Sequence, residues 1–148
     1  MNIRPATAND KTEWLRMRQC LWPDCSGQRH ALEMEQIWES SGVVLMAHRE
    51  DESVCGFIEV SVRNDHVPGA LATPIAYVEG WYVDTDCRRQ GIGHQLLASA
   101  EEWARSRSFE EIASDSVVDN EPSIRAHLAF GFREVSREVH FIKSLVSD

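Results

Sequence analysis

The residues with the clearest chemical meaning form a short turn in the second half of the chain. Residues 88–93 read Arg-Arg-Gln-Gly-Ile-Gly, follow an apolar segment and precede an amphipathic one with helical spacing. Glycines let backbone N–H groups converge at the start of a helix, where the helix dipole adds partial positive charge. Because Arg88 and Arg89 can pair with phosphate oxygens, the turn predicts an anion-binding site. The alternative is an ordinary strand-to-helix turn with solvated arginines.

Two other phosphate-binding signatures do not match this turn. A P-loop needs a glycine-rich run that ends in Lys-Ser or Lys-Thr, and the sequence contains none. The dinucleotide-binding fingerprint needs three glycines after an early strand, whereas this turn has two and lies past the middle of the chain. These two classes of nucleotide site are therefore not indicated.

Two carboxylates near the turn are candidates for acid–base chemistry. Glu79 lies in the otherwise apolar segment 75–83, and strand alternation predicts that its side chain shares a face with Trp81. A carboxylate there is costly unless it is solvated or paired with a cation, so Glu79 is a candidate base or amine-binding group, or one half of a structural ion pair. Asp115 ends the next apolar segment and could face Glu79, where two carboxylates would bind an ammonium group well. The alternative for Asp115 is a turn-capping role.

The elements that position these residues alternate between strands and helices. We predict strands at residues 2–4, 43–48, 54–62, 75–83 and 111–115, and a strand or strand pair at 133–144. We predict one helix that follows the cap residues 7–10 and ends at about residue 20, and others at 30–41, from the glycine turn onward, and at 122–131. This order predicts a mixed α/β sheet with one crossover around the glycine turn. We expect a single domain over residues 1–148.

Composition limits the classes of function. The chain has 148 residues, is 43% hydrophobic and 26% charged, and carries a formal net charge of −9. Such a balance argues against a nucleic-acid partner and is compatible with a cationic substrate, although acidic charge also simply favours solubility. No apolar run reaches membrane-spanning length and the N-terminus is not a signal peptide, so we expect a cytoplasmic protein without a membrane partner. The four cysteines form no C-x-x-C pair, which indicates free thiols and no metal site.

The Arg-x-x-Gly-x-Gly pattern after a hydrophobic strand resembles the acyl-CoA pyrophosphate loop of the GCN5-related N-acetyltransferases (GNAT). The predicted order of elements is similar to that family over nearly the whole chain, and Asn120 before a helix that ends at Gly131-Phe132 adds to the likeness. The resemblance implies a mostly antiparallel sheet, flanked by helices, with a V-shaped split between its fourth and fifth strands. It also implies direct transfer of an acetyl group from acetyl-CoA to an amine, with no metal and no covalent enzyme intermediate.

The same resemblance assigns the acetyl-CoA contacts. The pantetheine arm would bond to the backbone of Trp81, Tyr82 and Val83, with Asn120 as a side-chain partner, and the pyrophosphate would be held by Arg88, Arg89, Gln90, Gly91, Ile92 and Gly93. Glu79 would take the proton of the amine or orient it. His127 stands where the family usually has a tyrosine, and its imidazole could protonate the leaving thiolate.

Within the family, the chain looks most like the aminoglycoside 6′-N-acetyltransferases of the chromosomal resistance type. Four segments carry this likeness: Leu21-Trp22-Pro23, the loop from Asp65-His66 to Gly69, Val78-Glu79-Gly80, and Ala113-Ser114-Asp115. The implied sugar site comprises Trp22, Cys25, His66, Glu79, Asp115 and Ser136. Relatives often have tyrosine at position 66 and an acidic residue at position 136, so His66 and Ser136 depart from the commoner pattern.

The likeness therefore implies an aminoglycoside substrate and antibiotic resistance. The alternatives are the same fold acting on a polyamine or a protein amine, and a non-catalytic acyl-CoA-binding module. Close relatives pair as homodimers, and the predicted strand through residues 140–142 would leave an edge to cover.

Overall fold

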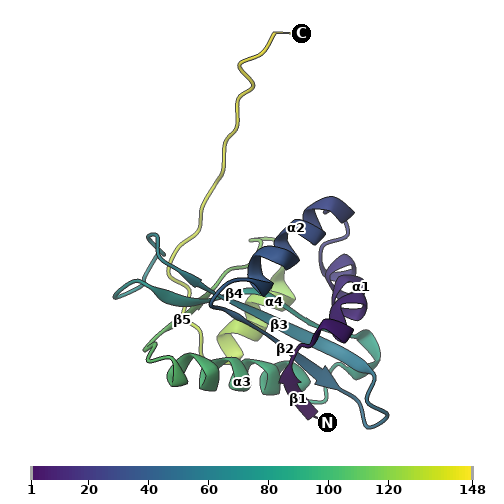
Figure 1. Cartoon of the computed structure of the whole chain (residues 1–148). Coiled ribbons are helices and arrows are strands. Elements are labelled where there is room, and N and C mark those ends of the chain that lie inside the picture. Colours follow the sequence, from purple (N-terminus) through teal and green to yellow (C-terminus); the bar gives the residue numbers. More distant parts are fainter. Residues whose placement is uncertain (1, 148) are drawn as a thin grey trace. The chain divides into compact units, whose positions relative to one another are not determined.

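The computed structural model describes residues 2–147 in two compact units, the first ending at Asp115 and the second beginning at Ser116. Within the described part of the first unit, five strands form one sheet in the order β1-β2-β3-β4-β5 (Figure 1). Neighbouring strands are antiparallel except for β4 and β5, which are parallel. This arrangement confirms the predicted mixed, mostly antiparallel sheet. The strands are β1 (Asn2–Pro5), β2 (Val43–His48), β3 (Val54–Arg63), β4 (Ile75–Val83) and β5 (Ile112–Ser114).

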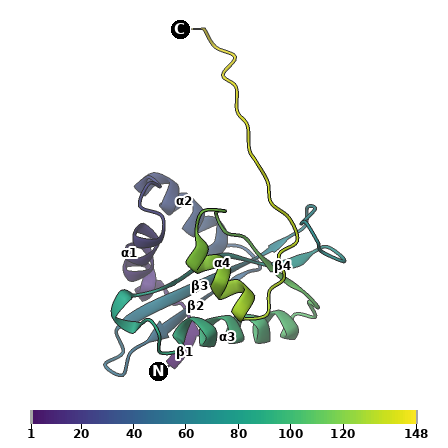
Figure 2. The same ribbon diagram turned by 180° about the vertical axis from the view of Figure 1, so that it is seen from behind.

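Helices cover both faces of this sheet. On one face lie α1 (Lys11–Leu21) and α2 (Gly27–Trp38), and on the other lies α3 (Ile92–Ser106) (Figures 1 and 2). Trp14 of α1 and Phe57 of β3 are fully buried in one apolar cluster on the first face, and Leu96 of α3 is fully buried as well. Short 3₁₀ turns precede α1 and α3, namely η1 (Ala8–Asp10) and η2 (Thr85–Cys87).

The second helix begins earlier than its apolar spacing predicts. It starts at Gly27 rather than at residue 30, because the Ser26 hydroxyl accepts a hydrogen bond from the Arg29 N–H at 3.1 Å and caps the first turn. It ends at Trp38 rather than at residue 41. The hydroxyl of Ser40 donates to the Ile37 carbonyl at 2.7 Å, which satisfies one of the last helical carbonyls as the chain leaves the helix.

The ladder between β3 and β4 contains a β-bulge. Glu59 of β3 pairs with Gly80 of β4, and the next residue, Val60, pairs with Val78. Glu79 is therefore the extra residue between two consecutive pairs. Bulges bend a strand locally and redirect the side chain that they carry, and they are frequent next to active sites.

The bulge decides the direction of the Glu79 side chain. Its carboxylate accepts hydrogen bonds from Ser61 and Arg63 of β3, and it lines a cavity together with residues of α1 and α2. The indole N–H of Trp81, in contrast, donates to the Gly93 carbonyl of α3 at 3.1 Å. The prediction that Glu79 and Trp81 share a face was wrong, because simple alternation does not continue through a bulge.

Strands β4 and β5 pair over a short stretch only. Residues 76–78 of β4 pair with residues 112–114, whereas β4 continues to Val83. Among the described residues, the part of β4 beyond Val78 has no strand partner on the β5 side. The predicted split between the fourth and fifth strands is confirmed, and it leaves a backbone edge to which an extended ligand can bond.

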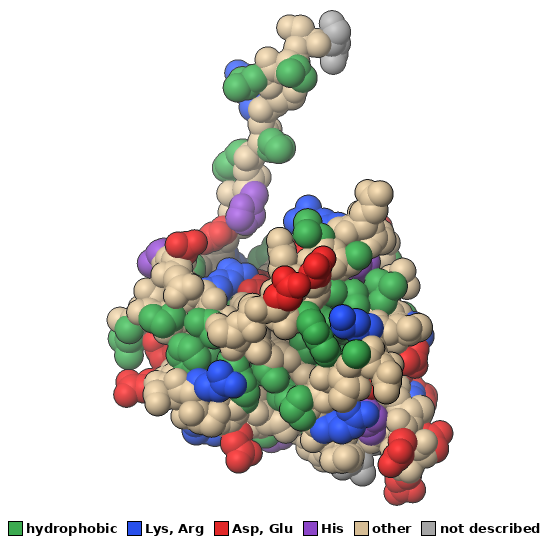
Figure 3. All heavy atoms as spheres, in the orientation of Figure 1, with side chains coloured by type: hydrophobic (Ala, Val, Ile, Leu, Met, Phe, Trp, Pro, Cys, Tyr) green, Lys and Arg blue, Asp and Glu red, His purple; other side chains and the backbone are tan. Residues whose placement is uncertain are grey.

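The second unit contains α4 (Glu121–Ala129) and an extended tail (yellow in Figures 1 and 2). Over residues 133–147 the described chain forms no strand, so the predicted strand or strand pair at 133–144 was wrong. A strand needs a neighbour for its backbone hydrogen bonds, and the described chain provides none for this segment. Apolar side chains stay exposed along the tail (green in Figure 3), among them Val139, Phe141, Ile142, Leu145 and Val146.

Within residues 2–147, none of the helices combines the length and the apolar character that crossing a membrane requires.

Candidate active site

A cavity of about 720 Å³ lies in the first unit between the loop after α1, helix α2 and strands β3 and β4. Three of the residues predicted for the sugar site line it, namely Trp22, Cys25 and Glu79. Its polar lining also includes Arg18, Asp24, Arg29, Glu33, Glu59 and Ser61. The cavity therefore presents several carboxylates, which suits a ligand with more than one positive charge.

Glu79 is held by two side chains of the neighbouring strand. The Ser61 hydroxyl donates to Glu79 Oε2 at 2.6 Å. Arg63 donates through Nε to the same oxygen at 2.9 Å and through Nη2 to Oε1 at 2.6 Å. This is a bidentate arginine–carboxylate pair, the strong geometry for such contacts. The hydrogen bond to Glu79 raises the pKa of Arg63, so the guanidinium is always charged.

Asp115 is joined to Glu79 through two intervening side chains. The Tyr77 hydroxyl donates to Asp115 Oδ2 at 2.5 Å, and the Arg63 guanidinium lies 3.5 Å from the centre of the Tyr77 ring. Burial, followed by the hydrogen bond to Asp115, raises the pKa of Tyr77 above its usual range, so this hydroxyl remains a donor. The two predicted carboxylates therefore belong to one connected group, with a cation and a phenol between them.

A buried ion pair that the sequence analysis missed forms the floor of the cavity. Arg18 pairs with Glu59 through Nη1 and with Glu33 through Nη2 at 2.6 Å. The indole N–H of Trp14 donates to Glu59 at 2.8 Å. Burial raises the pKa of Glu59, and the charge and hydrogen bonds of Arg18 oppose that rise. The available signal was the same as for Glu79: a carboxylate within an apolar strand.

Arg18 also fixes the aromatic wall of the cavity. Its guanidinium lies 4.7 Å from the centre of the Trp22 ring, and Trp22 stacks on His30 with ring centres 6.4 Å apart. Arg18 Nε donates to His30 Nδ1 at 3.1 Å. Trp22 also lies against Gly80, where a Cβ atom would come within 2.7 Å of the indole. The position of the Trp22 ring therefore depends on the buried guanidinium of Arg18 and on the presence of glycine at position 80.

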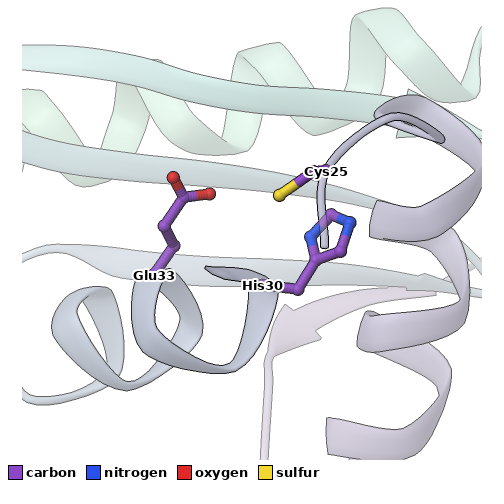
Figure 4. A group of neighbouring side chains, drawn as sticks. All are labelled: Cys25, His30 and Glu33. Carbon is purple, nitrogen blue, oxygen red and sulfur yellow. The ribbon is translucent and has the colours of Figure 1, made fainter. Parts of the chain in front are cut away.

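Cys25, His30 and Glu33 form a cluster beside this wall (Figure 4). One potential ligand atom from each lies within 4.8 Å of the others. Two of these donors are already engaged, since His30 Nδ1 accepts from Arg18 and Glu33 pairs with Arg18 and Arg29. Two guanidinium groups repel a bound cation, so the chemistry of this donor set fits the ion-pair network rather than a metal.

The glycine turn leaves the start of helix α3 open. Gly91 precedes the helix with φ +79°, in the left-handed region that favours glycine, and as the N-cap residue it provides no side chain to cap the first turn. The first N–H groups of a helix have no intrahelical acceptor, so they can bind an anion. Arg88 Nε donates to the Val83 carbonyl at 2.8 Å, and Gln90 donates to the Asp86 carbonyl at 3.3 Å. These contacts order the turn around the helix terminus.

Ion pairs hold the segment that leads into the turn. Asp84 accepts hydrogen bonds from both terminal nitrogens of Arg16, each at 3.0 Å, and from Arg49 at 3.1 Å. Arg49 also pairs with Asp86 at 2.8 Å. Burial by itself would raise the pKa of Asp84, but the arginine contacts outweigh burial and lower it. The end of β4 is thereby tied to α1 and to the residue after β2.

Of the remaining predicted site residues, His66 does not line this cavity, and Asn120, His127 and Ser136 belong to the second unit. His66 is exposed in the loop between β3 and β4. Asn120 caps α4, since its Oδ1 accepts from the Ser123 N–H at 3.2 Å. His127, also on α4, has Nδ1 at 2.7 Å from the Ser123 carbonyl oxygen. Ser136 is exposed in the tail.

The chain is similar to proteins of one enzyme family. A model of the acetyltransferase (GNAT) family matches residues 12–132. A relative from Klebsiella aerogenes, aminoglycoside N(6')-acetyltransferase type 1, is 40% identical over 147 residues and is covered to 96%, with 97% of this chain covered. A relative of the same name from Stenotrophomonas maltophilia is 37% identical over 139 residues, which cover 94% of this chain and 90% of that protein.

Two solved structures of aminoglycoside N-acetyltransferases are also similar to this chain. The crystal structure of apo aminoglycoside 6'-N-acetyltransferase AAC(6')-IG from Acinetobacter haemolyticus matches with a TM-score of 0.89 and 34% identity, covering 99% of this chain and 100% of that one. AAC(6')-Iy in complex with the bisubstrate analog CoA-S-monomethyl-acetylneamine matches with a TM-score of 0.88 and 28% identity, covering 97% of each chain.

Proposed function

Because the chain belongs to the acetyltransferase (GNAT) family, we propose that it transfers the acetyl group of acetyl-CoA to the 6′-amino group of aminoglycoside antibiotics. The observation that carries this assignment is the similarity, along almost the whole chain, to aminoglycoside N(6')-acetyltransferases at up to 40% identity. The carboxylates in the cavity support it, because aminoglycosides carry several ammonium groups. The chain is therefore an acyltransferase of antibiotic resistance.

The acetyl-CoA site comprises the open edge of β4 and the start of α3. Acetyl-CoA supplies the activated acyl thioester. The backbone of Trp81, Tyr82 and Val83 bonds the pantetheine arm, and residues 88–93 hold the pyrophosphate at the helix N-terminus. The edge of β4 beyond Val78 and the glycine N-cap of α3 support this assignment. Asn120 is assigned as a side-chain partner of the pantetheine arm.

Glu79 is the base in this proposal. The amine nitrogen bonds to the acyl carbon as the C–S bond breaks, and Glu79 accepts the proton released from nitrogen, directly or through water. Backbone N–H groups near Val83 polarise the carbonyl. His127 donates a proton to the leaving thiolate. The position of Glu79 at a bulge in the cavity wall supports its role.

The remaining assignments concern the drug and its surroundings. Trp22, Cys25, His66, Asp115 and Ser136 complete the sugar site, with Trp22 offering a flat apolar face to a sugar ring. We also propose that the two units act as one acetyltransferase domain over residues 1–148, which the family match across residues 12–132 supports. The site is proposed to work without a metal, in the cytoplasm, and without nucleic-acid or membrane partners.

A homodimer is the proposed assembly. The tail exposes Phe141 at 92% and Ile142 at 101% of their full surface, a state that soluble chains normally avoid. β5 is an edge of the sheet. An edge strand and an extended apolar segment complement one another, so the tail of one copy can add to a second copy. Sedimentation of the whole chain, compared with a Phe141→Asp variant, tests this assembly.

The reaction is tested by CoA thiol release from acetyl-CoA. Tobramycin and kanamycin carry a 6′-amino group, a matched aminoglycoside with a 6′-hydroxyl serves as the control, and spermidine is the second amine. Rapid release with the 6′-amino drugs only is the expected result. Release with spermidine alone would move the substrate to polyamines. Absence of release with every amine, despite binding of acetyl-CoA, would contradict the proposal.

A further inference from the structure

Arg63 holds both oxygens of the Glu79 carboxylate, the group proposed to bind the amine of the substrate. Its Nε and Nη2 donate to the two carboxylate oxygens at 2.9 and 2.6 Å, and Ser61 donates to one of them at 2.6 Å. An incoming ammonium needs at least one of these oxygens for its own charge-assisted hydrogen bond. An ammonium group at this carboxylate also lies beside the positive charge of Arg63, and the two like charges repel each other, so the drug and Arg63 compete for the same carboxylate.

The Arg63 side chain is exposed enough to separate from Glu79. It is 42% exposed and stands at the last residue of β3, next to the loop of residues 64–74. Although the bidentate geometry strengthens this pair, water can solvate each partner when they separate, so the pair opens more easily than a buried one. Its guanidinium already lies over the Tyr77 ring, whose hydroxyl is bonded to Asp115. A guanidinium that leaves Glu79 can thus keep its aromatic contact and turn toward a second carboxylate.

We propose that Arg63 is an exchangeable counter-ion of Glu79, which the ammonium group of the substrate must displace before acetyl transfer. The inference rests on the proposed role of Glu79 in amine binding. Separating Arg63 from Glu79 costs the same free energy for every amine. An amine therefore binds well only if its other contacts more than offset this cost. A drug with several ammonium groups can do so through other carboxylates of the cavity, such as Asp24, which forms no ion pair within residues 2–147. A sugar with one ammonium group has only Glu79.

The test compares Arg63→Gln with wild type in steady-state kinetics. We expect the KM for tobramycin to fall about fivefold while kcat stays within about twofold, because the pair is already open in the productive complex. A 6-amino-6-deoxyglucoside, with one ammonium group, should gain in kcat/KM by the same factor. Arg63→Lys keeps the charge without the bidentate fork and should lie between the two.

The control is Arg4→Gln, which makes the same change in net charge at an arginine that is 41% exposed and pairs with Asp10. Its KM should equal that of wild type. An unchanged or raised KM in Arg63→Gln, or a loss of kcat of about tenfold with both amines, would overturn the proposal and make Arg63 a positioning residue for Glu79. If wild type acetylates no aminoglycoside, the proposed function fails by itself. Titration calorimetry of the same amines then decides the Arg63 proposal without turnover, since Arg63→Gln must bind them more tightly.

Discussion

The Arg18–Glu59 pair and the Arg63–Glu79 pair are built from the same two residue types but differ in burial. The side chains of Arg18 and Glu59 are each 2% exposed, whereas those of Arg63 and Glu79 are 42% and 28% exposed. Opening the buried pair leaves two charges without water, while opening the exposed pair lets solvent replace each partner. The first pair is therefore a fixed part of the cavity floor, and the second can be exchanged for a ligand.

The surroundings of the two pairs match this division of roles. Arg18 is bonded to Glu33 and His30 as well as to Glu59, and it supports the Trp22 ring from below. Each guanidinium nitrogen of Arg18 thus has a partner, and a buried network of this kind is costly to disturb at any point. Arg63 has the Glu79 carboxylate on one side and the Tyr77 ring on the other. The same substitution at Arg18 and at Arg63 should therefore have unequal effects.

The largest expected difference is in stability. Arg18→Met leaves Glu59 buried without its counter-ion and should lower the free energy of unfolding by about 3–5 kcal/mol. Arg63→Met should lower it by less than about 1 kcal/mol, since the pair is exposed. Urea unfolding followed by tryptophan fluorescence and circular dichroism measures both. Equal losses in the two variants would remove the distinction between a fixed and an exchangeable pair.

The next difference is in catalysis. Glu79→Gln keeps the shape of the side chain but cannot accept the amine proton, so kcat/KM for tobramycin should fall by about 100-fold, equivalent to about 2.7 kcal/mol. Binding of acetyl-CoA, measured by calorimetry, should not change. Ser61→Ala removes only the hydroxyl that donates to this carboxylate and should cost less than about tenfold. Full activity in Glu79→Gln would exclude the carboxylate from the mechanism.

The sequence was sufficient for the elements that local pattern determines. Apolar runs predicted β2, β3 and β4, and the two glycines predicted the turn at the start of α3. A lone carboxylate in an apolar strand singled out Glu79. The same signal at Glu59 has its explanation in Arg18, 41 positions away, and no local pattern reveals such a distant partner.

Two features could not be predicted from the sequence of a single segment, because they depend on how that segment pairs with its neighbours. The direction of Glu79 follows from a bulge, which is a property of the register between β3 and β4. The tail has the apolar pattern of a strand, but strand formation requires a paired neighbour, and the described chain offers none. The predicted roles of Asn120, His127 and Ser136 depend on the second unit and remain predictions.

A smaller effect, on the KM, is expected from a substitution at Gly80, which follows Glu79 in the sequence and lies next to Trp22 and the Glu59 carboxylate. A Cβ atom at Gly80 would be 2.7 Å from Trp22 and 3.2 Å from Glu59. Gly80→Ala should displace the indole and raise the KM for tobramycin about tenfold, with kcat affected less. Gly27→Ala is the matched control, because its added Cβ has nothing within 4 Å. An unchanged KM in Gly80→Ala would mean that the Trp22 wall does not contact the drug.

The smallest expected effect concerns an ion pair of intermediate burial and extends the comparison to pH. The Asp84 side chain is 11% exposed and is paired with Arg16 and Arg49. Its pKa in the folded protein lies below the ordinary 3.8, so its contribution to stability is complete above that value and is lost as the pH falls toward the folded-state pKa. Asp84→Asn should therefore cost about 1 kcal/mol at pH 7 and progressively less below about pH 3.8. Urea unfolding of wild type and variant across this range gives the difference, with the more exposed Asp86→Asn as control. A difference that persists unchanged at about pH 2 would show that Asp84 stabilises the end of β4 through its packing and not through its charge.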